Sequence, residues 1–391
     1  MASILCVWEM GGGTGHLANL TPWVKEAVRR GHRVTLAVPN VDIAARWFAG
    51  HAIDIVPAPL SPQQRKPPAA QLLSFTQVLL HNLGAADELA PRVAGWQALF
   101  DRLQPDVVLY EFAPAALIAS LGRPWQKWII GNGFTLPRVD LPYFGLFPRV
   151  RNTEANTRAL ATAETQLVHW VNSVQTEALT HPAELYAQAD EQLLMTLPDI
   201  DPFGERPTPS YLGVAAPEPG ARPQWPERSG TRVFGYLQPF PGLPRLLQHL
   251  QHLGQSDACA LIYCPGLPAS ASAAYPAINM TGRPLDLGQT FDQADLVITM
   301  ASHTTSAQAF LAGTAQLLLP MGLEQFYTAR RIVAAGRGIG ARADQFEKGV
   351  LDQALALAAR GRADINAKQR HALQGGNLGR KVTALFDALP L

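Results

Sequence analysis

Short apolar runs alternate with longer amphipathic stretches along the first half of the chain. The apolar runs contain few polar positions, which is typical of strands buried on both faces of a parallel sheet. This pattern predicts strands at Ile4–Trp8, Arg33–Val38, Ile53–Val56, Val107–Tyr110 and Trp125–Ile130. The longer stretches predict helices over Leu17–Arg30 and Thr153–Ala189. Strands that alternate with helices indicate an α/β fold.

The same rhythm returns after a segment that is rich in proline and glycine. Six of the sixteen residues from Ala215 to Gly230 are Pro or Gly, which indicates a semi-stiff linker. We therefore predict a first domain over 1–215, a linker over 216–230 and a second domain over 231–391, with the last helix as a candidate to return to the first domain. Strands of the second domain are expected at Arg232–Tyr236, Ala258–Tyr263, Leu296–Thr299 and Gln316–Leu319. Helices are expected at Thr305–Ala312, Gln325–Ala335 and from about Lys381 to Leu389.

Composition narrows the class of protein. A chain of 391 residues that is 47% hydrophobic can bury two cores, and 32 basic against 31 acidic residues give no basic face for nucleic acid. Cys6, Cys259 and Cys264 lack the spacing of a zinc site, so no metal is predicted. The first residues lack the basic start and apolar stretch of a signal peptide, and no apolar run reaches the ~18 residues that span a bilayer. We expect a cytoplasmic enzyme, and leave peripheral contact with a membrane open.

A glycine-rich loop ending in a histidine follows the first strand. The segment Gly11–His16 does not match the dinucleotide or P-loop motifs, because His16 stands where the dinucleotide motif needs glycine and the P-loop motif is absent. Histidine titrates near neutral pH and can take a proton from a hydroxyl group, so His16 is a candidate base. Glu111 ends another strand and is its candidate partner. The alternatives are a capping histidine and a solvated glutamate.

Two polar segments follow strands of the second half. Small hydroxyl residues around Ser302, Thr304 and Thr305 stand at the start of a helix, where backbone N–H groups can bind an anion such as a diphosphate. Glu324 and Gln325 follow the strand at Gln316–Leu319 and together offer acceptors and donors to sugar hydroxyls. An ordinary helix cap and an ordinary first-turn glutamate are the alternatives.

These segments resemble those of nucleotide-sugar glycosyltransferases of the UDP-glycosyltransferase class, and also the peptidoglycan N-acetylglucosaminyltransferase. The resemblance lies in Gly11–His16, Arg30–Thr35, Leu197–Gly213 and Ala294–Gly338. It implies a GT-B fold of two facing Rossmann-like domains with a cleft between them, the first binding the acceptor and the second the nucleotide sugar. His16 matches the family's base and Glu111 falls near its acidic partner. The donor-binding residues expected are Gly13, Thr14, Tyr236, Arg283, Leu285, Ser302, His303, Thr304, Thr305, Glu324 and Gln325.

One segment departs from the family pattern. The family usually has His-Gly-Gly where this chain has Met300-Ala301-Ser302, and a thioether cannot donate a hydrogen bond to phosphate, so His303 or Ser302 is expected to substitute. We expect an inverting, metal-independent transferase with no cofactor besides the nucleotide-sugar co-substrate. The proline-rich loops Pro57–Pro68 and Phe134–Pro148, the second of them aromatic, suggest a small hydrophobic or lipid-like acceptor, unless they fill the domain's own surface. A nucleotide-sugar epimerase or hydrolase and a non-catalytic sugar-nucleotide-binding partner protein are the alternatives.

Overall fold

The computed structural model describes residues 1–60, 68, 71–204, 206–207, 211–255, 258–268 and 270–389. The chain forms two compact units. The first comprises Met1–Met195, Pro202–Leu212 and Leu378–Leu391, and the second comprises Thr196–Asp201 and Gly213–Asn377. The chain thus passes four times from one unit to the other. Most of the predicted loop Pro57–Pro68 lies outside the described residues.

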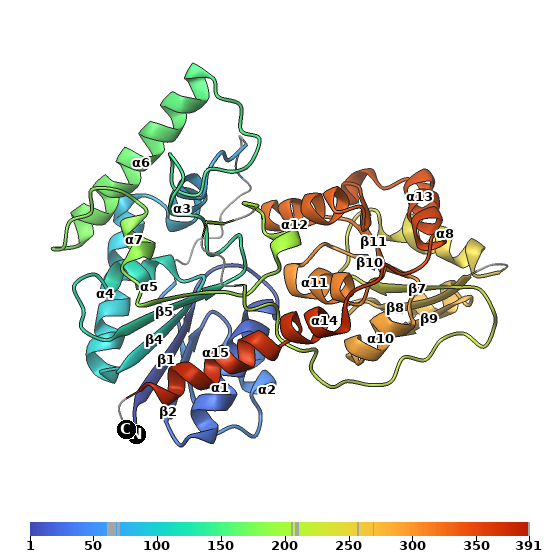
Figure 1. Cartoon of the computed structure of the whole chain (residues 1–391), viewed down its shortest axis with the longest axis horizontal. Helices are drawn as coiled ribbons and strands as arrows, with labels where there is room; N and C mark the ends of the chain where they lie inside the picture. Colours follow the sequence, from blue (N-terminus) through green and yellow to red (C-terminus); the bar gives the residue numbers. More distant parts are fainter. Residues whose placement is uncertain are drawn as a thin grey trace. The chain divides into compact units, whose positions relative to one another are not determined.

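The first unit is built on a six-stranded parallel sheet with the order β3-β2-β1-β4-β5-β6. Its strands are β1 (Ser3–Trp8), β2 (Arg33–Val38), β3 (Asp54–Pro57), β4 (Val107–Glu111), β5 (Gln126–Gly131) and β6 (Glu191–Leu194). Its helices are α1 (Gly15–Arg29), α2 (Val41–Trp47), α3 (Phe75–Leu83), α4 (Ala86–Leu103), α5 (Pro114–Ala119), α6 (Glu154–Val174), α7 (Glu184–Ala187) and most of α15 (Gly376–Asp387). Figure 1 shows α1, α2 and α15 along one face of this sheet and α4, α5 and α7 along the other.

The helical prediction for Thr153–Ala189 is only partly right. Helix α6 ends at Val174, and a turn separates it from the short α7. The backbone is already extended at Gln175, and Pro182, just before α7, could not continue a helix because of its ring and its missing N–H. The aromatic loop Phe134–Pro148 fills the unit's own core, since Phe134, Phe144 and Phe147 are buried and the rings of Phe134 and Phe147 stack at 5.8 Å.

The C-terminal helix α15 packs on the first unit through the segment that follows α1. Arg30 forms an ion pair of 2.7 Å with Asp387, and the His32 ring stacks on Phe386 at 5.7 Å. Nδ1 of His32 accepts a hydrogen bond of 3.1 Å from the backbone N–H of Ala2. The segment Arg30–Thr35 therefore holds both ends of the chain on the same unit.

The second unit contains another six-stranded parallel sheet, with the order β12-β11-β10-β7-β8-β9. Its strands are β7 (Thr231–Tyr236), β8 (Ala258–Tyr263), β9 (Ile278–Thr281), β10 (Leu296–Thr299), β11 (Ala315–Leu318) and β12 (Gly338–Gly340). Its α-helices are α8 (Leu243–Leu253), α9 (Ser270–Ala274), α10 (Leu287–Gln293), α11 (His303–Leu311), α12 (Leu323–Ala334), α13 (Lys348–Ala358) and α14 (Ala367–Leu373). Short 3₁₀ turns lie at Pro198–Ile200 and Ala343–Gln345.

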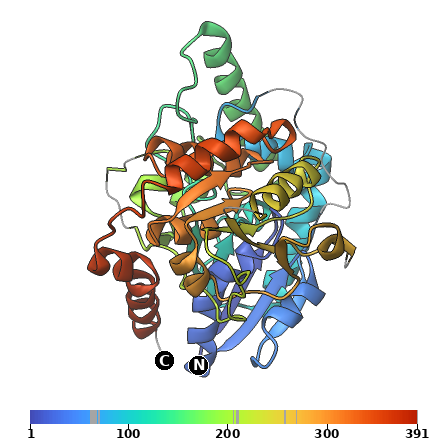
Figure 2. The same ribbon diagram turned by 90° about the vertical axis from the view of Figure 1, so that its right-hand side faces the viewer.

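Both faces of the second sheet are apolar, as the unbroken apolar runs predict. Val233, Ile262 and Ile298 point to the face covered by α8 and α13, while Phe234 and Val297 point to the face covered by α10 and α11. Figure 2 shows α8 and α13 together on their face. The predicted α/β class, with two Rossmann-like units, is confirmed.

The segment Ala215–Gly230 contains no regular helix or strand and packs on the second unit. Backbone hydrogen bonds join Ala221 to Pro284 and Asp286, and the Trp225 indole N–H donates to Gln293 at 2.8 Å.

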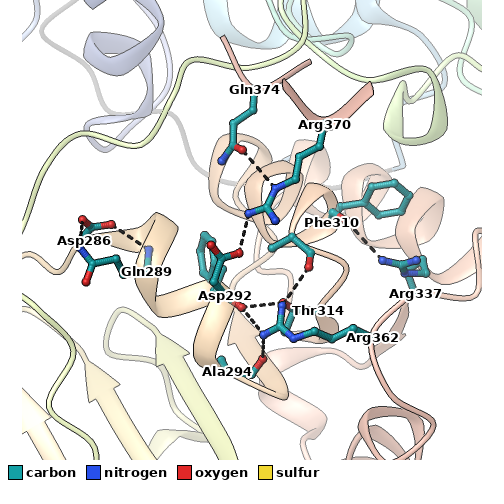
Figure 3. Close-up of polar contacts among 12 residues, drawn as sticks. Asp286, Gln289, Asp292, Ala294, Phe310, Thr314, Arg337, Arg362, Arg370 and Gln374 are labelled. Carbon is teal, nitrogen blue, oxygen red and sulfur yellow. Dashed lines mark hydrogen bonds and ion pairs between the residues drawn. The ribbon is translucent and has the colours of Figure 1, made fainter. Parts of the chain in front are cut away.

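Figure 3 shows how the side chain of Arg362 joins the ends of two helices in the second unit. Its guanidinium donates to the carbonyls of Phe291, Ala294 and Ala312, which lie at the C-terminal ends of α10 and α11. Arginine thus satisfies carbonyl groups that a helix leaves unpaired at its end.

Candidate active site

The first unit brings His16 and Glu111 together. Strand β1 lies beside β4, so residues that follow their carboxyl ends meet where the strand order changes direction, a common ligand site in α/β sheets. His16 is the second residue of α1, and its Nδ1 lies 2.8 Å from Oε1 of Glu111. Glu111 is almost completely buried, and His16 is 11% exposed. If Nδ1–H donates to the carboxylate, Nε2 is left as a proton acceptor.

Gly11 is required by the position of the His16 ring. Its φ is +86°, and a Cβ atom at this position would lie 2.2 Å from Nε2 of His16. A side chain would therefore displace the imidazole or the loop. Gly13 and Thr14 are exposed in the same loop, and Thr14 precedes α1 without capping it through its side chain.

Asn19 is part of this arrangement, although the sequence reasoning missed it. Its amide donates to the same Oε1 of Glu111 at 3.2 Å, and the residue is buried. Oε2 of Glu111 is buried and has no hydrogen-bond partner within the described ranges. Asn19 follows His16 by three positions, which places both on one face of a helix, so the spacing could have indicated it.

The predicted donor residues of the second unit follow the carboxyl ends of β7, β10 and β11, which are neighbours in the sheet, and of the edge strand β9. Tyr236 ends β7, Ser302–Thr305 follow β10, Glu324 and Gln325 follow β11, and Arg283 and Leu285 follow β9. Tyr236 is half-buried beside Tyr263, with ring centroids 5.1 Å apart, and burial raises its pKa. Arg283 is exposed, whereas the Leu285 side chain is buried in the core, so only the backbone of Leu285 remains for a ligand.

His303 begins helix α11 and is buried. Its Nε2 lies 2.7 Å from the hydroxyl of Thr196, a contact that nothing in the sequence indicates. Burial lowers the pKa of His303 to about 4, so the ring is neutral near pH 7. A neutral ring cannot supply the charge-assisted bond to phosphate that an imidazolium would supply.

Met300 and Ala301 form the turn between β10 and α11. The Met300 side chain belongs to the apolar cluster beneath α8 and α13. Ala301 has φ +57°, a conformation that suits glycine, and its N–H donates to the Thr299 hydroxyl at 3.0 Å. Ala301 thus has the backbone geometry of a glycine position although it carries a side chain.

The start of α11 offers groups for an anion. The Ser302 side chain does not cap the helix, and Thr304 and Thr305 are half-buried. The first-turn amides of a helix have no intrahelical acceptor, and the macrodipole favours negative charge there. After β11, Oε1 of Gln325 accepts the N–H groups of Met321 and Gly322 at 2.8 and 3.1 Å, which leaves its NH₂ group pointing away from that cap. Glu324 is half-buried beside it.

Within the described ranges, no three His, Cys, Asp or Glu side chains gather in a way that could hold a metal ion. The sequence contains one Asp-x-Asp triplet, Asp199–Asp201. Asp199 is exposed and Asp201 is completely buried, so the two carboxylates lie in different environments and do not form one metal site. Within the same ranges, no helix combines the length and the apolar character needed to cross a membrane.

Comparisons with known proteins agree with this architecture. No protein-family model matches the sequence. The zeaxanthin glucosyltransferase of Pseudescherichia vulneris is 25% identical over 377 residues, which cover 85% of this chain and 84% of that protein. The kitacinnamycin glycotransferase structure matches with a TM-score of 0.69 and 16% identity, over 100% of this chain and 99% of its own. The glycosyltransferase VinC, solved with dTDP, matches with a TM-score of 0.62 and 16% identity, over 99% and 96% of the two chains. The chain therefore has the GT-B fold of two Rossmann-like units and is similar to these glycosyltransferases.

Proposed function

We propose that this protein is a glycosyltransferase that moves a sugar from a nucleoside diphosphate sugar to a hydroxyl group of a small hydrophobic acceptor, with inversion at the anomeric carbon. The observation that carries the proposal is the 2.8 Å contact between Nδ1 of His16 and Oε1 of Glu111 at the junction of β1 and β4. The relative from Pseudescherichia vulneris is named for zeaxanthin, which is a hydroxylated hydrophobic molecule of the proposed acceptor class.

In the proposed reaction, Nε2 of His16 takes the proton of the acceptor hydroxyl. The oxygen attacks the anomeric carbon from the face opposite the diphosphate, a new C–O bond forms, and the bond to the phosphate oxygen breaks. Glu111 holds the tautomer and stabilises the imidazolium that forms. The nucleoside diphosphate leaves with the electron pair, and the proton on His16 passes to solvent.

In this proposal, the N-terminus of α11 stabilises the diphosphate leaving group. Its first-turn amides, with the hydroxyls of Ser302, Thr304 and Thr305, would receive the diphosphate without a metal. VinC was solved with dTDP, so a nucleoside diphosphate is the ligand class to test first. Glu324 and Gln325 would hold hydroxyl groups of the donor sugar.

The test is product analysis with UDP-glucose or dTDP-glucose and a panel of hydroxylated hydrophobic acceptors. We expect a glycosylated acceptor with an inverted anomeric configuration, formed equally in the presence of EDTA. His16→Ala should keep donor binding and lower turnover by roughly two or more orders of magnitude. Equal turnover in this variant would remove His16 from the mechanism, and an altered free sugar without a glycoside would favour an epimerase or hydrolase.

A further inference from the structure

An indole ring lies against the imidazole of His16. The ring centroids of Trp8 and His16 are 4.9 Å apart with an interplanar angle of 23°. Phe112 lies nearly parallel to the same imidazole, with a centroid distance of 6.2 Å and an angle of 24°. Trp8 and Phe112 are only 4% and 8% exposed, so both side chains are buried and held in place by their neighbours.

A hydrogen bond at the indole nitrogen holds the Trp8 side chain in place. Its indole N–H donates to the carbonyl of Met10 at 2.6 Å, and the backbone N–H of Met10 donates to the carbonyl of Phe112 at 3.1 Å. Trp8 is also the register partner of Glu111 in the sheet. The residue that stacks on the imidazole and the residue that bonds its Nδ1 are therefore neighbours across β1 and β4.

The turn that carries Phe112 holds a strained backbone. Phe112 has φ +45°, in the left-handed region that a bulky residue rarely occupies. Such a conformation persists only where the surroundings fix it, and strained residues of this kind cluster at functional sites. Here the Met10 hydrogen bond and the ring of Phe75, 6.2 Å from that of Phe112, hold the turn.

We propose that Trp8 is a positioning residue for the base: its indole keeps the His16 ring in the plane in which Nδ1 meets Glu111, and stabilises that ring when it carries the transferred proton. The face of an indole attracts a cation, and Trp is the strongest of the aromatic side chains in this respect. This inference rests on the proposed role of His16.

Among the described residues, two carboxylates stand next in sequence to the aromatic rings that pack on His16, namely Glu111 and Glu9. Glu111 on β4 is bonded to His16, whereas Asn19 on α1, Trp8, Phe112 and Gly11 are not ionised near neutral pH. Glu9 is the next residue of the loop after β1, but its carboxylate pairs with the Arg92 guanidinium at 3.6 Å and accepts hydrogen bonds from the Trp96 indole and the Ala115 amide. A pH effect of replacing Trp8 is thus expected to act through the His16–Glu111 pair.

The experiment compares Trp8→Phe, Trp8→Leu and Trp8→Met in the full chain. Phe keeps an aromatic face, while Leu and Met keep apolar volume without one. We expect Leu and Met to lower kcat about 10- to 100-fold with the donor KM unchanged, and Phe to stay within about threefold of the wild type. The acidic limb of the pH–rate profile should move about half a pH unit lower in the Leu and Met variants, because the imidazolium loses its aromatic neighbour.

NMR supplies a readout besides activity. The ring protons of His16, assigned with His16→Ala, should lose an upfield ring-current shift in Trp8→Leu and keep part of it in Trp8→Phe. The control is Trp23→Leu, which removes a buried indole of α1 whose ring faces Trp128. It should lower stability without moving the pH profile.

The outcomes separate this inference from the proposed function. If His16→Ala is inactive while Trp8→Leu and Trp8→Met match Trp8→Phe in kcat and pH profile, the role of Trp8 is overturned and that of His16 stands. If His16→Ala turns over like the wild type, the proposed function fails first. If Trp8→Leu does not fold, Trp8→Met against Trp8→Phe decides the question.

Discussion

The hydroxyl of Thr196 lies 2.7 Å from Nε2 of His303, so a residue at the crossing between the two units fixes the ring at the start of α11. Burial lowers the pKa of His303 to about 4 from an ordinary value of 6.5. The folded protein thus keeps this ring neutral over a pH range in which the unfolded chain protonates it.

The first prediction is that His303 makes the second unit sensitive to acid. Because its folded pKa is depressed, its contribution to stability is present above about pH 6.5 and is lost as the pH falls toward 4. The expected loss is about 3 kcal/mol in the free energy of unfolding. Denaturant titrations from pH 7 to pH 4 should show a smaller loss in His303→Gln than in the wild type. Equal losses in both proteins would contradict the prediction.

Asn19→Ala should lower turnover roughly 10- to 100-fold, since a hydrogen bond to a charged group contributes about 1.5–3 kcal/mol and Glu111 would lose one of two donors. Steady-state kinetics with a saturating donor measure the effect. Asn156→Ala, which removes an amide on α6 bonded to the Arg151 carbonyl, is the matched control. Wild-type kcat in Asn19→Ala would exclude Asn19 from the site's function.

Ala301→Gly should stabilise the protein. Ala at φ +57° is strained by about 1–2 kcal/mol relative to glycine, and the added chain entropy of glycine offsets part of this. We expect a net gain of about 0.5–1 kcal/mol in chemical denaturation. Ala307→Gly, within α11, is the control and should lose about 1 kcal/mol. A loss in both variants would show that the Ala301 methyl contributes packing that outweighs the strain.

Met300→His should lower stability by about 1–3 kcal/mol without tightening donor binding, because the side chain lies in an apolar cluster. Thermal unfolding and calorimetry with UDP and dTDP measure the two effects. Tighter nucleotide binding by Met300→His would mean that the imidazole leaves the core and reaches the phosphate.

Gln325→Glu separates two roles of one side chain. Glutamate keeps an oxygen for the N–H groups of Met321 and Gly322 but loses the amide donor proposed for the sugar. Affinity for the nucleotide sugar should fall about two- to tenfold, while affinity for the free nucleotide stays constant. Gln325→Ala should in addition loosen the turn before α12. An equal loss for both ligands would place Gln325 away from the sugar.

Sequence patterns located most strands, because buried parallel strands are apolar throughout. They also located the loop Gly11–His16 after β1, because it is rich in glycine. They missed β6, β9 and β12, which are short strands near the sheet edges. The sequence paired His16 with Glu111, since both follow strand ends that a parallel sheet brings to one edge. It could not find Thr196 beside His303, because that contact depends on how distant segments pack.

The sequence also could not predict which of the candidate side chains are buried, or how burial changes their charge. The sequence offers His303 as a residue for phosphate, yet only the packed structure shows that its ring is buried and neutral. Likewise, Trp8 is an ordinary apolar residue at a strand end, and its place against His16 follows from the register of β1 with β4.

The docking of α15 on the first unit bears on chimeric enzymes. Because Arg30 pairs with Asp387 and His32 stacks on Phe386, residues 378–389 belong physically to the half that carries His16. A hybrid that joins the first half of this chain to the second half of a relative at one crossover would pair α15 of one parent with α1 of the other. A second crossover near Asn377, returning to the first parent, would keep that interface native.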